Sequence, residues 1–444
     1  MWGESKAPNR LSFGHRDPRS SSATARWVRA AVAMLACVTY SSGHAADATP
    51  GATVDSVLLI ARERNPEYAA MRLEAEAAEQ RVYPAGALPD PKFRNEFRDI
   101  TRMESQNPTL LPSRIGSNRY LLMQDVPWFG KRELKREIAQ ADAHAAGGRA
   151  TATWVELASK IKTAFAQLYY VHRNEALTRE ILDLVVRLEK VAQVRYAGGL
   201  AAQQDVIRAQ VEQTNLRNEL VALENERRQL QARMNGLLSR PAVAPLAEPQ
   251  VLRPLPAAAK LDYAVLESRA RERNPLLVSE ASRIKSSQKA RELAYKNRYP
   301  DFTFGFSPIQ YQNAVREWEV MVELNIPLQQ KTRRSQEREA EAMVSAALAR
   351  REATSNQVLS ELSESLAGLE AARRTEALVS DSLLPQAQLT FESALAAYQN
   401  GKVDFATLLD AQRQIREAKQ TRFKAQAEAR MRLADIEKLV GDDL

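Results

Sequence analysis

The residues that most often bind metals or perform catalysis are scarce in this chain. It has four histidines (His15, His44, His144 and His172) and one cysteine, Cys37, which lies in an apolar run near the N-terminus. These residues do not have the spacing of zinc ligands. The sequence also has no phosphate-binding loop, nucleophile triad or pair of carboxylates at catalytic spacing. It therefore gives no basis for an enzyme, a metal site or a cofactor.

The first 45 residues have the pattern of a secretory signal peptide. Arg26 and Arg29 precede the apolar run 30–40, and a small-residue cleavage site ends at Ala45. Acylation of Cys37 as a lipoprotein is the alternative to cleavage. Without residues 1–45 the formal charge falls from +8 to about +4, too weak and dispersed to indicate nucleic acid binding. We expect an exported protein whose mature part has no cysteine and no disulfide.

The hexapeptide ARERNP occurs at 61–66 and again at 270–275. Other similar segments follow in the same order at nearly the same offset, including RYAGGLAAQQDVIRAQ at 195–210 and AYQNGKVDFATLLDAQ at 397–412. A two-fold repeat explains this order. We interpret the Arg and Glu residues of the hexapeptide as solvated helix-face charges and its Asn-Pro as a helix boundary. The expected divisions are a signal peptide (1–45), a first repeat (46–238), a Pro-rich connector (239–260) and a second repeat (261–444).

Each repeat predicts short helical and strand segments followed by a long helical hairpin. Alternation of apolar and polar residues predicts strands at about 92–99, 118–126, 301–308 and 316–325. Leucines spaced three and four residues apart predict coiled-coil hairpins at about 131–238 and 329–440. We expect Gly147-Gly148 to weaken the first long helix and Pro385 to kink or break its equivalent. The fold class is therefore mainly α with a small β part.

The apolar faces of the four strands leave two arrangements open. Four strands cannot close a barrel, and unpaired strand edges are not tolerated in lipid. If these faces meet lipid, several chains must share a barrel, with about eight strands from two chains or twelve from three. The soluble alternative is that both strand pairs pack against a domain core. Periodicity does not decide between them.

Several segments resemble those of the TolC-type outer-membrane efflux protein family. They are GALPDP (86–91), QDVPWFGKRELKREIAQADAHAA (124–146), YAGGLAAQQDVIRAQ (196–210), YPDFTFGF (299–306), LNIPL (324–328) and YQNGKVDFATLLDAQRQ (398–414). LPDP followed by VPWFGKR is most similar to the heavy-metal, CzcC- and CusC-like branch. The resemblance implies a homotrimer with a shared twelve-stranded barrel in the outer membrane and an α-helical barrel in the periplasm. It also implies a periplasmic adaptor and an inner-membrane pump of the resistance-nodulation-division type as partners.

The same resemblance suggests roles for particular residues. Trp318, Val320, Val322 and Leu324 would face lipid, whereas Glu319 and Glu323 would face the lumen. Segments 100–117 and 309–315 would be extracellular loops. Gly198, Gly199 and Gly401 would form the hairpin turns that meet the adaptor. The periplasmic entrance would involve Asp205, Asp404 and Asp410, with Arg195, Lys402 and Arg413 as candidates to pair with them.

The resulting hypothesis is a passive outer-membrane duct of a tripartite efflux system, exporting heavy-metal cations. Multidrug efflux and type I protein secretion are alternative uses of the same duct. A periplasmic adaptor predicts one hairpin flanked by Gly-rich β domains, whereas this sequence predicts two hairpins. A purely structural exported coiled coil leaves the alternating strands and their duplication unexplained.

Overall fold

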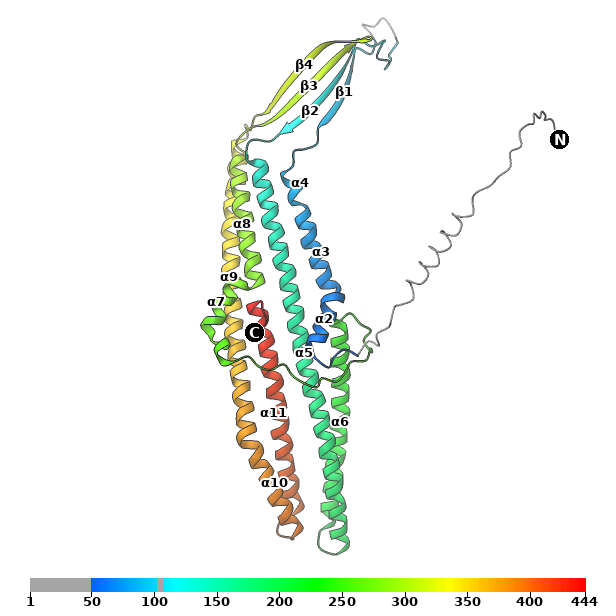
Figure 1. Ribbon diagram of the computed structural model, residues 1–444, viewed down its shortest axis with the longest axis vertical. Coiled ribbons are helices and arrows are strands. Elements are labelled where there is room, and N and C mark those ends of the chain that lie inside the picture. The colour runs from blue at the N-terminus through cyan, green and yellow to red at the C-terminus, as the bar shows by residue number, and fades with distance from the viewer. Residues whose placement is uncertain (1–48, 102–106) are drawn as a thin grey trace, which may run out of the picture. The chain divides into compact units, whose positions relative to one another are not determined.

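The computed structural model describes residues 49–101 and 107–444, and the signal peptide expected at 1–45 lies outside them. Before the connector, the elements are α2 (Val54–Arg64), α3 (Pro66–Gln80), α4 (Val82–Gly86), β1 (Lys92–Arg98), β2 (Ser117–Val126), α5 (Lys131–Ala197) and α6 (Gln203–Leu237). After it follow the short 3-10 helix η1 (Ala258–Leu261), α7 (Tyr263–Arg273), α8 (Pro275–Lys296), β3 (Asp301–Tyr311), β4 (Ala314–Asn325), α9 (Gln330–Leu378), η2 (Val379–Leu383), α10 (Leu384–Gln399) and α11 (Phe405–Val440). The two sets run through their helices and strands in the same order (Figure 1).

The four strands form one antiparallel sheet in the order β1-β2-β3-β4. The expected loop at 309–315 was wrong, because β3 and β4 stay paired as far as Tyr311 and Ala314. Only Gln312 and Asn313 separate these strands, and Gln312 has a φ of 55°. A register shift between Ile309 and Gln310 interrupts the period of two, which explains why the alternation in the sequence ends too early.

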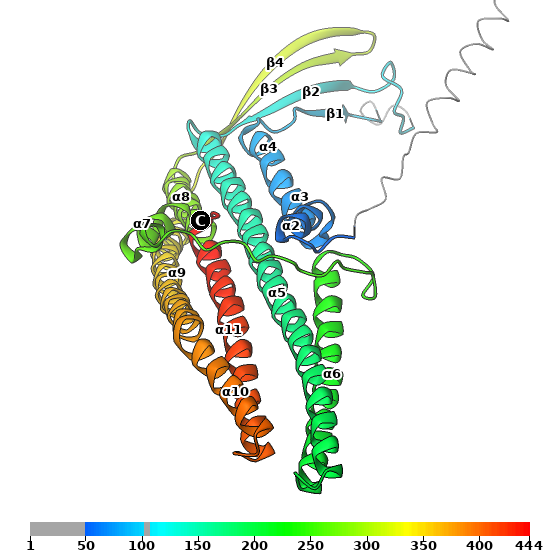
Figure 2. The same ribbon diagram turned by 60° about the horizontal axis from the view of Figure 1, so that its bottom comes forward.

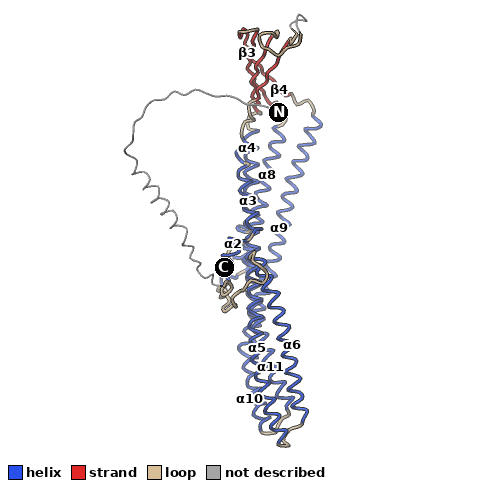
Figure 3. Tube along the Cα trace, turned by 90° about the vertical axis from the view of Figure 1, so that its right-hand side faces the viewer, coloured by secondary structure: helices blue, strands red, loops and turns tan. Residues whose placement is uncertain are grey.

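The helices lie side by side, with the sheet at one end and the hairpin turns at the other (Figure 3). Next to the sheet, α5 contacts α3 and α8, and α8 contacts α9. Farther from it, α5 contacts α6 and α11 (Figure 2). The 67 residues of α5 extend over about 100 Å, so this helix packs both against the helices next to the sheet and against those farther from it. Among the described residues, no helix is both long and apolar enough to cross a membrane.

Gly147 and Gly148 do not interrupt α5, and Gly148 has a packing role. A Cβ atom at Gly148 would lie 3.0 Å from Cβ of Ser279 and 3.1 Å from the carbonyl oxygen of Pro275, both on α8. Ser279 Oγ donates a hydrogen bond to the carbonyl of Ala145 at 3.0 Å. The glycine therefore allows α5 and α8 to approach closely, which offsets part of its cost to the helix.

Pro385 lies in a helical region that continues through it. The chain passes from α9 through the π-helical turn η2 into α10, and Pro385 stands in the first turn of α10. Proline at that position needs no hydrogen bond from its own nitrogen. The wider turn before it therefore accommodates the ring, and the expected break is replaced by a local change in helix type.

The ARERNP hexapeptides join corresponding helices in the two halves. Asn65 and Asn274 cap α3 and α8, each accepting backbone N–H bonds on its side-chain oxygen. Their amide nitrogens donate to the carbonyl of Leu237 at 3.0 Å and of Leu439 at 2.8 Å, near the ends of α6 and α11. Both asparagines are buried. One side chain thus satisfies backbone groups of two helix ends at once.

Candidate functional site at the hairpin tips

Each helical hairpin reverses direction in a short turn, and both turns lie at the end of the helices farthest from the sheet (Figure 2). We call residues 198–202 the first tip and residues 400–404 the second tip. Gly199 has a φ of +71° and Gly401 a φ of +69°, a backbone conformation that L side chains rarely adopt. Gly198 has a negative φ of −85° and caps the end of α5. Positive φ therefore explains the glycine at two of the three predicted positions.

Arg195, at the end of α5, connects the first tip to the second. Its Nη1 donates to the carbonyl oxygen of Gln399 at 2.7 Å, and its Nη2 donates to that of Leu200 at 3.4 Å. The guanidinium also lies 5.0 Å from the ring centroid of Tyr398, within the range of a cation–π interaction. The sequence predicts that Arg195 pairs with a carboxylate at the tips, but its hydrogen bonds go to backbone carbonyls instead.

Apolar packing joins the tips beneath Arg195. Leu188 and Ala209 from the first hairpin share a buried cluster with Tyr398, Phe405 and Leu408 from the second. The rings of Tyr398 and Phe405 lie 5.3 Å apart in a tilted arrangement. Among the described residues, the hydroxyl of Tyr398 has no hydrogen-bond partner. The ring of Tyr398 therefore contributes by packing and by its interaction with Arg195.

Asp205 is a buried carboxylate in the first turn of α6. Burial raises its pKa, the positive charge of Arg208 opposes this, and the negative charge of Asp404 raises it further. Burial also raises the pKa of Tyr398, and the charge of Asp205 adds to that shift. These shifts favour the neutral form of both groups. The structure thus brings Asp205, Asp404 and Tyr398 together, although no sequence signal had pointed to Tyr398.

Asp404 and Asp410 occupy different environments on α11. Asp404 is the N-cap of the helix, and hydrogen bonds from the hydroxyl and the backbone N–H of Thr407 lower its pKa. The side chain of Asp410 is 66% exposed and lies 3.5 Å from Nη1 of Arg413. Nη2 of Arg413 makes a closer ion pair, at 2.5 Å, with the buried Glu212 of α6. Asp410 is therefore exposed and does not cap a helix, whereas Asp404 is a helix cap and Asp205 is buried.

A further ion pair and two hydrogen bonds continue this connection between the hairpins. Arg416 of α11 pairs with Glu219 of α6 at 3.0 Å. Gln420 donates to Glu219 at 3.0 Å and to Asn174 of α5 at 2.9 Å. With Arg413 and Glu212, these contacts form a row of polar links that we call the α6–α11 zipper. No sequence signal singled out Glu212 or Glu219, because charged residues are common on helix surfaces.

Lys402 lies in the second tip and is exposed. Among the described residues, it has no ion-pair partner, so the structure does not bring it to the predicted carboxylates. Of the predicted cations, only Arg413 forms an ion pair with a predicted acid. No group of three or more metal-binding side chains is found in the described part of the chain.

The sheet has one apolar face that is exposed to solvent in the single chain. Trp318, Val320, Val322 and Leu324 are 65%, 78%, 55% and 48% exposed. They stand opposite Pro308, Phe306, Phe304 and Phe302 of β3. Phe306 and Trp318 stack with ring centroids 5.3 Å apart. A face of this size and composition is expected to be covered by something apolar.

The opposite face of the sheet is polar and internally paired. Glu319 forms an ion pair with Arg119 of β2 at 2.7 Å. Arg119 also lies 3.7 Å from Glu96 of β1 and donates to Ser307 of β3 at 3.0 Å. Glu323 follows Glu319 by four residues, so it lies on the same face, and it stands opposite Thr303. The two predicted lumen glutamates therefore share a face with cross-strand polar contacts.

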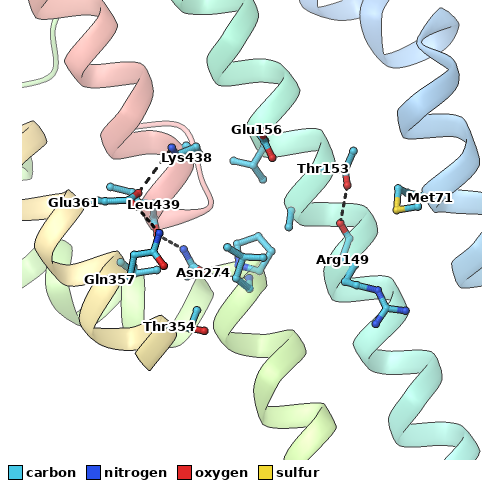
Figure 4. A pocket seen from close by; sticks show the side chains of 15 residues that line it. Met71, Arg149, Thr153, Glu156, Asn274, Thr354, Gln357, Glu361, Lys438 and Leu439 are labelled. Atoms are coloured by element: carbon cyan, nitrogen blue, oxygen red, sulfur yellow. Dashed lines mark hydrogen bonds and ion pairs between the residues drawn. The ribbon is translucent and has the colours of Figure 1, made fainter. Parts of the chain in front are cut away.

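A cavity of about 440 Å³ lies between α5, α8, α9 and α11 (Figure 4). Its charged lining residues are Arg149, Glu156, Glu361 and Lys438, and Lys438 lies 4.0 Å from Glu361. Figure 4 shows Arg149 on the opposite side of the cavity from that pair. Two acids and two bases give no net preference for cations or anions, so we assign this cavity no function.

Comparison with known proteins agrees with this geometry. Residues 266–442 match the outer membrane efflux protein family. This match lies within the second repeat of the chain. It is 23% identical over 392 residues to the cobalt-zinc-cadmium resistance protein CzcC of Cupriavidus metallidurans, covering 83% of this chain and 84% of the relative.

Solved structures extend the similarity of fold to both halves of this chain. CusC has a TM-score of 0.74 at 15% identity, covering 88% of this chain and 92% of CusC. VceC of Vibrio cholerae has a TM-score of 0.73 at 16% identity, covering 88% and 96%. The predicted fold class is confirmed. The matched family is described as outer membrane efflux proteins and VceC as an outer membrane protein, in agreement with the resemblance seen in the sequence.

Proposed function

We propose that three copies of this chain form a duct with a shared twelve-stranded barrel in the outer membrane and a helical tunnel in the periplasm. The observation that carries this proposal is the exposed apolar face of a four-stranded sheet whose edge strands, β1 and β4, are each paired on one side only. Lipid tolerates an exposed apolar face but no unpaired strand edge. Pairing β4 of one copy with β1 of the next removes every edge when the ring closes. Residues 1–45 would direct export.

We further propose that the duct exports heavy-metal cations. The support is the similarity to CzcC over most of both chains. The chain offers no chemistry for using an energy source, so a resistance-nodulation-division pump in the inner membrane would drive transport. A periplasmic adaptor would connect this pump to the hairpin tips around Gly198, Gly199 and Gly401.

The closed entrance of the duct is proposed to lie at the tips. Arg195 and the α6–α11 zipper hold the hairpins of one chain together. In a three-fold ring, each exposed carboxylate appears three times, which produces a local negative field that attracts cations. Asp410 is the best candidate for such a ring because it is exposed, whereas Asp205 is buried and Asp404 caps a helix.

Planar-bilayer conductance of the purified protein tests this proposal. We expect stable conductance steps from a heat-modifiable trimer, and we expect Asp410→Ala to reduce the preference for cations over anions. Asp381→Ala, an exposed acid in η2 and farther from the tip, is the matched control and should leave that preference unchanged. A monomer that neither enters bilayers nor conducts would overturn the duct. Conducting trimers with equal selectivity in both variants would refute the role of Asp410.

A further inference from the structure

Aromatic rings follow one another where the strands meet the helices. Tyr299 stacks on Trp128 with centroids 5.1 Å apart and an interplanar angle of 9°. Trp128 stacks on Phe302 at 5.6 Å, and Phe302 stacks on Phe304 at 6.2 Å. Phe129 meets the edge of Trp128 at 5.9 Å. This ladder is continuous with the exposed apolar face of the sheet, because Phe302 and Phe304 belong to that face.

The position of the ladder is fixed by a partly buried ion pair. The backbone N–H of Trp128 donates to Asp301 at 2.8 Å, and Nζ of Lys131 bonds the same carboxylate oxygen at 2.8 Å. Lys131 also donates to the carbonyl of Tyr299 at 2.9 Å. Asp301 and Lys131 therefore hold the two stacked rings in one place, although Phe129 is 79% exposed and Tyr299 is 50% exposed.

Two further lysines lie beside the ladder without an acidic partner. Nζ of Lys296 donates only to the carbonyl of Phe129, at 3.4 Å. Lys135 lies one helical turn after Lys131 and close enough to Asp301 for its charge to act on that carboxylate. Among the described residues, neither Lys135 nor Lys296 forms an ion pair. Positive charge and exposed rings are thus combined on one fixed surface.

We propose that Trp128, Phe129 and Tyr299, with Lys135 and Lys296, form a headgroup site for anionic phospholipids at the lower boundary of the membrane. This inference rests on the proposed function, which places the adjoining strand face in lipid. Aromatic rings with a polar group favour the boundary between hydrocarbon and water. An ammonium group without an acidic partner beside them attracts a headgroup that carries net negative charge more than a zwitterionic headgroup. The occupant is therefore a lipid rather than a soluble anion, because the rings supply the apolar half of the site.

Spin-labelled lipids test this site in the full trimer reconstituted in phosphatidylcholine vesicles. The motionally restricted fraction is measured with labelled phosphatidylglycerol and with labelled phosphatidylcholine. We expect the wild type to prefer phosphatidylglycerol, and Lys135→Gln with Lys296→Gln to remove most of that preference. A cation near an anionic membrane surface changes affinity about fivefold. Salt at about 1 M should weaken the preference in the wild type, because the Debye length then falls to about 3 Å.

The matched control removes the same number of positive charges from the same two helices, α5 and α8, but away from the aromatic ladder. Lys190 of α5 and Lys285 of α8 are exposed, and neither has an ion-pair partner among the described residues. They lie about 80 Å and 16 Å along their helices from Lys135 and Lys296. Lys190→Gln with Lys285→Gln should keep the wild-type preference. Equal restriction of both lipids in the wild type, or equal loss in both double variants, would overturn the headgroup site. No restricted lipid in the wild type would instead contradict membrane insertion and the proposed duct.

Discussion

Replacing Arg195 with glutamine should loosen the proposed entrance at the hairpin tips. The change removes a charged donor from the carbonyl of Gln399 and a cation from the ring of Tyr398. A hydrogen bond to a charged group contributes about 1.5–3 kcal/mol and a cation–π contact about 0.5–1 kcal/mol. Since Arg195 is only partly buried, we expect the variant to lose about 2 kcal/mol of stabilisation of the closed tip per chain. This loss changes the ratio of open to closed tips about 30-fold.

Single-channel conductance measures this ratio as the fraction of time spent open. Lys402→Gln is the matched control, because Lys402 lies in the second tip, carries the same charge and has no ion-pair partner among the described residues. Arg195→Lys keeps the charge but cannot donate in the same fork, so it should fall between Arg195→Gln and wild type. Tyr398→Phe should behave as wild type because its hydroxyl has no partner in the described structure.

Two results would refute this reasoning. If Arg195→Gln and Lys402→Gln had the same open fraction, net charge at the tip would matter and the connection through Arg195 would not. If Arg195→Gln raised the open fraction without faster hydrogen exchange in residues 400–404, the substitution would act away from the contact with Gln399. The hydrogen-exchange measurement therefore separates a local release of the tip from a change elsewhere in the channel.

Three further substitutions test the contacts that hold the helices. Asn274→Ala should lower the free energy of unfolding by about 2 kcal/mol, since it removes a helix cap and the bond to Leu439; an unchanged thermal midpoint would contradict this role. Arg413→Gln leaves the buried carboxylate of Glu212 without its cation and should cost about 2 kcal/mol after allowing for the partial exposure of Arg413. Adding Glu212→Gln should recover most of that loss in urea unfolding. For Asp205, the raised pKa means that the folded chain binds its proton more tightly than the unfolded chain. Its contribution to stability is therefore present at acid pH and is lost as pH rises through the raised pKa; Asp205→Asn should remove this pH dependence from hydrogen exchange at the first tip.

Much of the architecture could be predicted from local patterns. Apolar residues spaced three and four apart determine helices wherever they occur, and the alternation around Trp318 determines a strand. The duplicated segments established that both halves share one order of elements. Strand ends were less predictable, because the register shift after Ile309 depends on pairing with β4 and not on the residues of β3 alone.

The contacts at the tips could not be predicted in the same way. The sequence drew attention to Asp205 and Arg195 by their place beside glycine turns. It could not show that Asp205 is buried near Tyr398, or that Arg195 donates a hydrogen bond to the carbonyl of Gln399. These contacts join residues about 200 positions apart, and they depend on how two long helical hairpins lie against each other.

The sequence by itself determined that the chain is duplicated and mainly helical with a small β part, because periodicity and repeated segments are local properties of the chain. Only the tertiary structure decided what the repeated ARERNP segment of each half does. Asn65 and Asn274 have the sequence of ordinary helix boundaries, yet each also bonds the end of a helix more than 160 residues away. A buried carbonyl needs a donor from whichever segment packs against it, and that segment is determined by packing and not by sequence neighbours.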